Sequence, residues 1–358
     1  ILHFAAGGGV PSLGIQAPAM KEFEKSPPEA RDLLLRPIRD LGLRIEGSPV
    51  EKYIQRLYGE LERKGLKHFK PLFYLTDQWG CPDEEPIIGV PFYLVNPQLA
   101  SLEREANDLE GDREIMRYMR HEAGHAFNYA YALYRTDEWR DLFGPFRRAY
   151  RDEYTPIPFS KKYVRHIEGW YAQKHPDEDF AETFAVWLTP GSNWKRKYAG
   201  WGALRKLQYV DRVAREVADK PPSKATGEID YSVDDLEESL SEFYRATAPD
   251  EREAIADLAL DTDLTDIFVE PPGDDGKELR SASKLLAENR KAIVDKITNW
   301  TGVRRSLVRI LVEEMQKKVG EQGLLVDRHR QSAALVEVTA YLTTLAMNFL
   351  TRGRFVHP

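Results

Sequence analysis

Apolar residues recur at helical spacing early in the chain. In residues 51–64 the repeat consists of Tyr53, Ile54, Leu57, Tyr58 and Leu61. Because this spacing places all five on one face, an amphipathic helix is expected there. Residues 1–50 are punctuated by glycines and prolines, so we expect an irregular arm with a short helix around residues 30–35.

Two stretches rich in β-branched and aromatic residues follow, at residues 71–75 and 87–95. Turn-forming residues separate them, so both are expected to be strands. Pro91 lies inside the second stretch and cannot donate a backbone hydrogen bond, which favours a sheet edge. An extended peptide could add to that edge as a further strand, and a plain structural hairpin is the alternative.

The helical pattern returns in residues 112–133, where Ile115, Met119 and Ala126 mark one face. A further helix is expected over residues 137–150. The first of these helices contains the strongest chemical signal in the chain.

A second core helix is expected after an irregular aromatic segment, residues 151–174. Pro176 suits its first turn, and Thr189 and Pro190 end it. Three acidic residues in its first turn complement the positive end of the helix dipole: Asp177, Glu178 and Asp179.

The composition changes after Val217. Residues 220–227 resemble a linker, and residues 228–276 carry 17 acidic and 2 basic residues, a net charge of −15. This acidic stretch lacks a calcium-loop pattern and is interpreted as a solvated surface. Two helices are expected to close the chain, at residues 303–319 and 327–350.

These patterns predict an α+β chain that is mostly helical. Its parts are an N-terminal arm (residues 1–50), a domain with a small N-terminal sheet (51–220) and a helical C-terminal region of unknown role (228–358). The net charge of −7 argues against general nucleic-acid binding, so no nucleic-acid partner is expected.

Cys81 is the only cysteine, so no intrachain disulfide can form, and a turn or core position is expected for it. No stretch approaches the roughly 20 apolar residues of a membrane span. The closest, residues 338–351, is expected to be a buried core helix, so no membrane partner is predicted. A cytoplasmic location is the default expectation. Because the sequence begins with Ile1, a removed leader is the alternative.

The chemical signal is His-Glu-Ala-Gly-His at residues 121–125. Two histidines four apart share one helix face, so His121 and His125 can reach the same Zn²⁺. Glu122 lies one residue round the helix and can reach a water on the metal as a general base. Gly124 conflicts with helix formation by roughly 1 kcal/mol, which predicts a close approach by another element.

A catalytic zinc ion needs a third protein ligand. The downstream candidates are His166, His175, Glu178, Asp179 and Glu182. Glu178 and Glu182 are four apart on one helix face, so one can bind the metal while the other accepts a hydrogen bond from a ligand histidine. Spacing alone does not choose between them.

A resemblance adds to this picture. Residues 171–184, Tyr-Ala-Gln-Lys-His-Pro-Asp-Glu-Asp-Phe-Ala-Glu-Thr-Phe, resemble the zinc segment of the anthrax lethal factor catalytic domain and related gluzincins. In those proteins a tyrosine seven residues before the ligand glutamate faces the metal. The resemblance implies that Glu178 is the ligand, that Glu182 hydrogen-bonds a ligand histidine, and that Tyr171 donates to the oxyanion.

Residues 65–210 as a whole are similar to a bacterial family of zinc-binding metallopeptidases. The motifs that carry this similarity are Asp77-Gln-Trp, Gly89-Val-Pro-Phe-Tyr-Leu, the residue 120–125 run and His175-Pro-Asp-Glu-Asp-Phe-Ala-Glu-Thr-Phe-Ala. The family implies a zincin-like catalytic domain, one catalytic Zn²⁺ and a peptide or protein substrate. No resemblance is found after residue 228.

Two classes of function follow from these observations. The first is a zinc metallopeptidase in which Glu122 activates a water and Tyr171 stabilises the oxyanion, with a non-protein amide as an alternative substrate. The second is a binding or regulatory protein that keeps the zinc site as a scaffold and engages a protein partner through its C-terminal helices. The intact Glu122 favours the first class, because a purely structural site needs no base.

Overall fold

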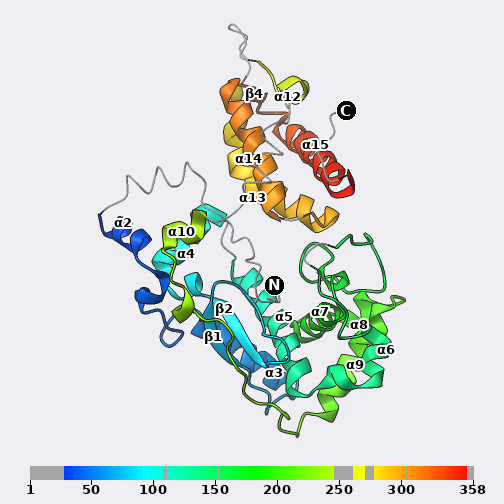
Figure 1. Cartoon of the computed structure of the whole chain (residues 1–358). Helices are drawn as coiled ribbons and strands as arrows, with labels where there is room; N and C mark the ends of the chain where they lie inside the picture. The colour runs from blue at the N-terminus through cyan, green and yellow to red at the C-terminus, as the bar shows by residue number, and fades with distance from the viewer. Residues whose placement is uncertain are drawn as a thin grey trace. The chain divides into compact units, whose positions relative to one another are not determined.

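The structure is a computed structural model that describes residues 28–107, 111–151, 154–245, 261–270, 278–303 and 305–352. The chain divides into two compact units, residues 1–247 and 248–358. The described part is mostly helical with two small sheets, so the predicted α+β class is confirmed (Figure 1). Most of the predicted N-terminal arm lies outside the described residues, as do residues 246–260 and 271–276 of the acidic stretch.

The first unit contains nine described α-helices, two strands and short 3₁₀ turns. Its helices and strands are α2 (Pro28–Leu35), α3 (Glu51–Arg63), β1 (Leu72–Thr76), β2 (Ile87–Pro91), α4 (Pro97–Asn107), α5 (Asp112–Ala130), α6 (Asp137–Phe143), α7 (Pro176–Leu188), α8 (Trp194–Lys197), α9 (Ala203–Glu216) and α10 (Leu240–Arg245). Its 3₁₀ turns are η1 (Ile38–Leu41), η2 (Phe92–Val95), η3 (Leu133–Arg135), η4 (Tyr171–Gln173) and η5 (Val233–Asp235).

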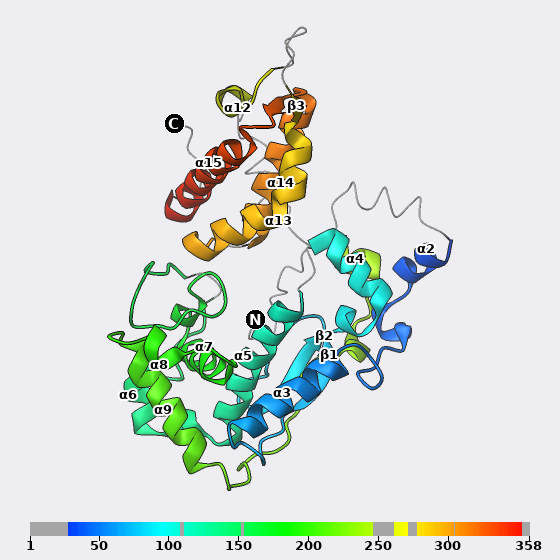
Figure 2. The ribbon, with the colours of Figure 1, turned by 180° about the vertical axis from the view of Figure 1, so that it is seen from behind.

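Helices α5 and α7 form the centre of this unit and lie side by side in both ribbon views (Figures 1 and 2). They approach closely at Gly124, where an added Cβ would lie 2.7 Å from the Cα of Ala181. One turn further along, the rings of Phe127 and Phe184 stack with centroids 4.9 Å apart. The close approach predicted from Gly124 is therefore confirmed, and α7 is the approaching element.

The hairpin, which was the alternative to an open edge, is not formed. Strands β1 and β2 pair in parallel, with Leu72 opposite Ile87 and Thr76 opposite Pro91. Parallel pairing requires the chain to return along the length of β1 before β2 begins, and residues 77–86 make that return. Strand β2 was expected to extend to residue 95, but it ends at Pro91. Residues Phe92–Val95 form the 3₁₀ turn η2.

The other side of β2 is not a free edge. Gly80 exchanges two backbone hydrogen bonds with Gly89, at 2.7 and 3.3 Å, and every residue of β2 is buried. Addition of a substrate strand beside β2 is therefore obstructed at Gly89, which contradicts the expected open edge at this strand.

Helix α6 ends seven residues earlier than expected, at Phe143. Gly144 adopts a φ of 110°, and Pro145 follows it. A proline restricts the residue before it, so this Gly-Pro pair ends the helix. Helix α9 was not predicted, although Leu207, Val210 and Val213 of its buried face lie at helical spacing.

The segment expected to be a linker packs along the first unit. Ser223 and Lys224 both bond the carbonyl of Ala130, and the Glu228 amide donates to the Glu85 side chain at 3.0 Å. Further on, Leu236, Leu240 and Phe243 belong to the core of this unit. The division after residue 247 therefore lies later than the composition suggested, because buried apolar residues are interspersed among the acidic ones.

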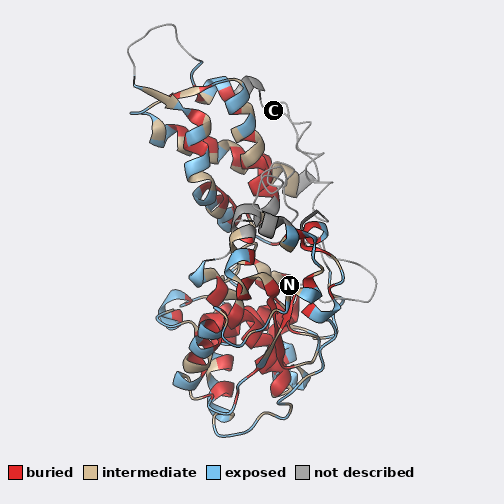
Figure 3. Cartoon of the chain, turned by 90° about the vertical axis from the view of Figure 1, so that its left-hand side faces the viewer, coloured by how far each residue is buried: buried red, intermediate tan, exposed pale blue. Residues whose placement is uncertain are grey.

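The second unit has its own core. Its elements are α12 (Asp261–Ile267), β3 (Leu279–Ser281), α13 (Ala282–Thr301), α14 (Arg305–Glu321), β4 (Leu325–Asp327) and α15 (Gln331–Arg352). Strands β3 and β4 are antiparallel, and the three long helices pack on one another. Figure 3 shows buried residues gathered inside each unit. The two closing helices were predicted, whereas α13 was missed.

Helix α15 is only partly the core helix that was predicted. Its inner face enters the second core through Ala334, Val338 and Leu342, but only 28% of Gln331–Leu350 is buried. By length and composition alone this stretch is long and apolar enough to cross a membrane. One such helix is weak evidence for a membrane span, since helices of soluble cores pass the same test.

Candidate metal site

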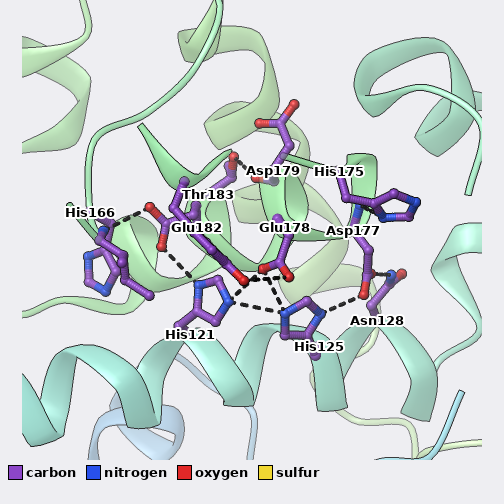
Figure 4. A network of polar contacts seen from close by, with 12 residues as sticks. His121, His125, Asn128, His166, His175, Asp177, Glu178, Asp179, Glu182 and Thr183 are labelled. Carbon is purple, nitrogen blue, oxygen red and sulfur yellow. Dashed lines mark hydrogen bonds and ion pairs between the residues drawn. The ribbon is translucent and has the colours of Figure 1, made fainter. Parts of the chain in front are cut away.

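Helix α5 supplies the two histidines of the predicted motif. The helix begins where the Glu114 side chain accepts a hydrogen bond from the Gly111 amide, at 2.9 Å. Four-residue spacing then places His121 and His125 on the face that meets α7, where both are at most 1% exposed. Their Nε2 atoms lie 3.1 Å apart (Figure 4).

Helix α7 supplies the third donor. The His175 ring caps its first turn by accepting the Asp177 amide at 3.2 Å, and Pro176 occupies the first helical position. Glu178 projects from this turn towards the histidines. Its Oε2 atom lies 2.9 Å from His121 Nε2 and 3.2 Å from His125 Nε2.

The triangle formed by these three donor atoms fits a zinc ion. Its sides of 2.9, 3.1 and 3.2 Å join two imidazole nitrogens and one carboxylate oxygen. Donors bound at about 2.0–2.1 Å in a tetrahedral arrangement lie roughly 3.3 Å apart. His121, His125 and Glu178 form the one cluster of potential metal ligands found among the described residues.

Each histidine has a carboxylate on its other ring nitrogen. Glu182 Oε1 lies 2.8 Å from His121 Nδ1, and Asp177 Oδ2 lies 2.6 Å from His125 Nδ1. Such contacts favour the tautomer in which Nδ1 carries the hydrogen and Nε2 is free to bind a metal. Both carboxylates are oriented by further donors, Glu182 by the Ile167 amide and Asp177 by Asn128 and Tyr129.

Asp177 is the residue that sequence analysis missed here. In the sequence, Asp177 was interpreted only as one of the acidic residues that complement the dipole of α7. Its contact with His125 could not be predicted, because that contact depends on how α5 and α7 cross. The available signal was its place directly before Glu178, on the turn that faces α5.

Glu122 differs from the other carboxylates of the site. It is fully buried, and neither of its oxygens has a hydrogen-bond partner among the described residues. Burial raises the pKa of Glu122, while the nearby histidines oppose that shift. A buried carboxylate without a partner is costly, so a polar group such as water fits beside it.

The electrostatics of the cluster favour a cation. Four buried carboxylates converge on two histidines: Glu122, Asp177, Glu178 and Glu182. Although burial lowers the pKa of His121, its hydrogen bonds with Glu178 and Glu182 raise that pKa to about 9. For Glu178 the two effects are reversed. Burial raises the pKa of its carboxyl, but the adjacent histidines hold that pKa well below its usual value.

Two tyrosine hydroxyls meet the outer oxygen of Glu178. Tyr171, in η4, lies 3.1 Å from Oε1, and Tyr150 lies 2.7 Å from the same atom. The two hydroxyls are 3.2 Å apart. Tyr150 was not predicted, because it lies 28 residues before Glu178 in an irregular segment and carries no motif.

The remaining candidates lie elsewhere. His166 donates to the carbonyl of Arg117 at 3.0 Å, His175 caps α7, and Asp179 pairs with the Lys206 ammonium on the far side of α7. Figure 4 shows His166 beyond Glu182 and Asp179 directed away from the histidines. Cys81 is buried, its thiol donates to the Glu85 carbonyl, and burial raises the pKa of that thiol.

Fold and site together define a mostly helical protein with a buried His-His-Glu cluster suited to a metal ion. A family model described as "Putative zinc-binding metallo-peptidase" matches residues 99–196, which include all three residues of the cluster. No curated protein matches the chain, and no solved structure matches it. The chain is therefore similar to a zinc-binding metallopeptidase family over the stretch that carries the site.

Proposed function

We propose that the protein is a zinc-dependent metallopeptidase in which His121, His125 and Glu178 hold one catalytic Zn²⁺. The observation that carries this proposal is the buried carboxylate of Glu122, which has no hydrogen-bond partner among the described residues and lies next to His121 on the helix that carries two of the three donors. A structural zinc site needs four protein ligands and no base, whereas a catalytic site keeps a position for water. The family similarity over residues 99–196 supports the same conclusion.

When bound, Zn²⁺ would lower the pKa of a water towards about 7 and polarise the scissile carbonyl. Glu122 accepts the proton of the attacking water and later donates it to the leaving amine. Burial suits Glu122 to this exchange, because it raises the pKa of the carboxylate and so eases its protonation.

Tyr171 is proposed as the donor to the developing oxyanion. Its hydroxyl lies 3.1 Å from Glu178 Oε1, next to the three donors of the cluster. Burial raises the pKa of Tyr171, which keeps the phenol protonated and able to donate. Removing one such donor typically costs about 10²–10³ in rate.

Metal content measured by mass spectrometry tests the ligand set. The wild type is expected to carry one zinc ion, and Glu178→Ala is expected to lose it. Glu182→Ala should still bind zinc, with an affinity about 10–100-fold weaker, because it loses only the partner of His121. If wild-type protein purified without zinc and did not take it up, the proposal would be wrong.

Peptide hydrolysis by Glu122→Gln tests the activity. This variant should bind zinc as the wild type does and lose about 10²–10⁴ in kcat, because an amide cannot accept the water's proton. Glu103→Gln, which alters another buried glutamate outside the cluster, is the matched control and should retain activity. Zinc binding without any peptide cleavage by the wild type would favour the scaffold hypothesis.

A further inference from the structure

We propose that Tyr150 is a positioning residue of this site. Its hydroxyl donates to the outer oxygen of Glu178, so that oxygen keeps a donor when Tyr171 turns its single hydroxyl hydrogen towards the substrate. This inference rests on the proposed metallopeptidase function and adds a residue that neither the motif nor the family similarity assigned.

The two oxygens of Glu178 have separate surroundings. Oε2 faces the Nε2 atoms of His121 and His125 at 2.9 and 3.2 Å. Among the described residues, the contacts of Oε1 are with two hydroxyls, that of Tyr150 at 2.7 Å and that of Tyr171 at 3.1 Å. Glu178 is therefore oriented to present one oxygen to the metal position and the other to the tyrosine pair.

The number of hydroxyl hydrogens decides which tyrosine donates to Glu178 Oε1 and which can donate to the substrate. Each phenol carries one hydrogen to donate. Tyr150 makes the shorter contact with Oε1, of a length typical for a hydroxyl donating to a carboxylate. Tyr171 can donate to Oε1, to the Tyr150 oxygen 3.2 Å away, or to a substrate. Since Tyr150 already satisfies Oε1, turning Tyr171 towards a substrate leaves no buried oxygen without a donor.

The position of Tyr150 is fixed by residues at the start of α7. The His175 ring donates to the carbonyl of Arg148 at 2.8 Å, which ties the Tyr150 segment to the helix that carries Glu178. The His175 and Tyr150 ring centroids are 5.3 Å apart. The Lys174 ammonium lies 4.5 Å from the Tyr150 ring centroid and 5.5 Å from that of Tyr171.

Two measurements on Tyr150→Phe test the proposal in the full chain: zinc affinity by competition with a chromophoric chelator, and kcat and KM at saturating zinc. Zinc affinity should fall about 10–100-fold, because a ligand carboxylate loses its outer donor. With zinc saturating, kcat should fall about tenfold with KM nearly unchanged, because Tyr171 now turns to Oε1. Combined with Tyr171→Phe, the change should lower zinc affinity but cause no further loss of kcat.

Tyr154→Phe is the matched control. Its hydroxyl comes from the same segment and donates to the carbonyl of Gly169 at 2.6 Å, so its removal costs a similar hydrogen bond without touching Glu178. This variant should keep zinc affinity and kcat. Equal losses in the Tyr154 and Tyr150 variants would reduce the role of Tyr150 to stability of the segment and overturn the proposal.

The other outcomes are also decisive. Wild-type zinc affinity and kcat in Tyr150→Phe would refute the positioning role, and independent, multiplying losses in the double variant would refute its coupling to Tyr171. If the wild type bound zinc but cleaved no peptide, the proposed activity would be wrong. The zinc affinity of Tyr150→Phe would still show whether the contact of Tyr150 with Glu178 supports metal binding. A wild type that bound no zinc would overturn both proposals.

Discussion

Replacing Gly124 with alanine tests the packing that brings α5 and α7 together. The new Cβ would lie 2.7 Å from Ala181 Cα and 2.9 Å from Ala181 O. Both atoms belong to the backbone of α7, so no side-chain rotation can relieve the contact. Ordinary contact begins at 3.4 Å, and the helices must therefore separate by roughly 0.7 Å at this point.

Two opposing effects set the size of the result. Overpacking of this kind typically costs about 1–3 kcal/mol, whereas replacing a helical glycine by alanine gains about 1 kcal/mol. The free energy of unfolding of Gly124→Ala should therefore fall by up to about 2 kcal/mol. Because a site tolerates displacements of only about 0.5 Å, zinc affinity should fall as well.

Gly59→Ala on α3 supplies the control. The nearest atom to its new Cβ is the flexible end of Arg63, at 3.7 Å, so only the gain in helix propensity remains. Urea unfolding should show this variant to be more stable than the wild type by about 0.5–1 kcal/mol. If Gly124→Ala gained stability as Gly59→Ala does and bound zinc normally, the inferred close approach would be refuted.

Three further predictions concern groups around the site. Lys206→Met should lower the free energy of urea unfolding by about 3 kcal/mol, because it leaves buried Asp179 uncompensated, and adding Asp179→Asn should recover much of that loss. Glu60→Gln should cost about 3 kcal/mol in the same assay, because buried Arg120 donates to both Glu60 oxygens at 2.6 and 2.8 Å; an unchanged midpoint would contradict this. Burial lowers the pKa of His166 to about 4, so the unfolded chain binds its proton first as the pH falls below about 6.5. Stability should then decrease between pH 6.5 and 4 by up to about 3 kcal/mol more in the wild type than in His166→Gln, and parallel pH profiles would disprove the shift.

Elements governed by local rules were predictable from the sequence. The apolar face of α3 follows from its spacing, and the start of α7 follows from Pro176 and the acidic first turn. Helix α13 was missed although Leu286, Ile293 and Ile297 of its buried face also lie at helical spacing. That omission was avoidable, because the signal is local.

Features that depend on tertiary contacts could not be found in this way. The parallel pairing of β1 and β2 depends on how residues 77–86 return, and no turn residue encodes that path. The contact of Asp177 with His125 arises across two helices, and that of Tyr150 with Glu178 spans an irregular segment. Local sequence patterns therefore identified the histidines of the site, but not all the groups that orient its ligands.

The packing of α5 on α7 explains why Glu178, and not Glu182, lies between the two histidines. Three pairs of residues meet across these helices at three-residue steps: His121 with Glu178, Gly124 with Ala181, and Phe127 with Phe184. The carboxylates meet the histidines in the opposite order along the two helices, because His121 contacts Glu182 and His125 contacts Asp177, on either side of Glu178. Glu182 lies one turn beyond Glu178 on α7 and therefore meets the other nitrogen of His121. The glycine contact and the stacked phenylalanines bring the two helices together beside this cluster, so the residues that pack the core also set the spacing of the candidate ligands.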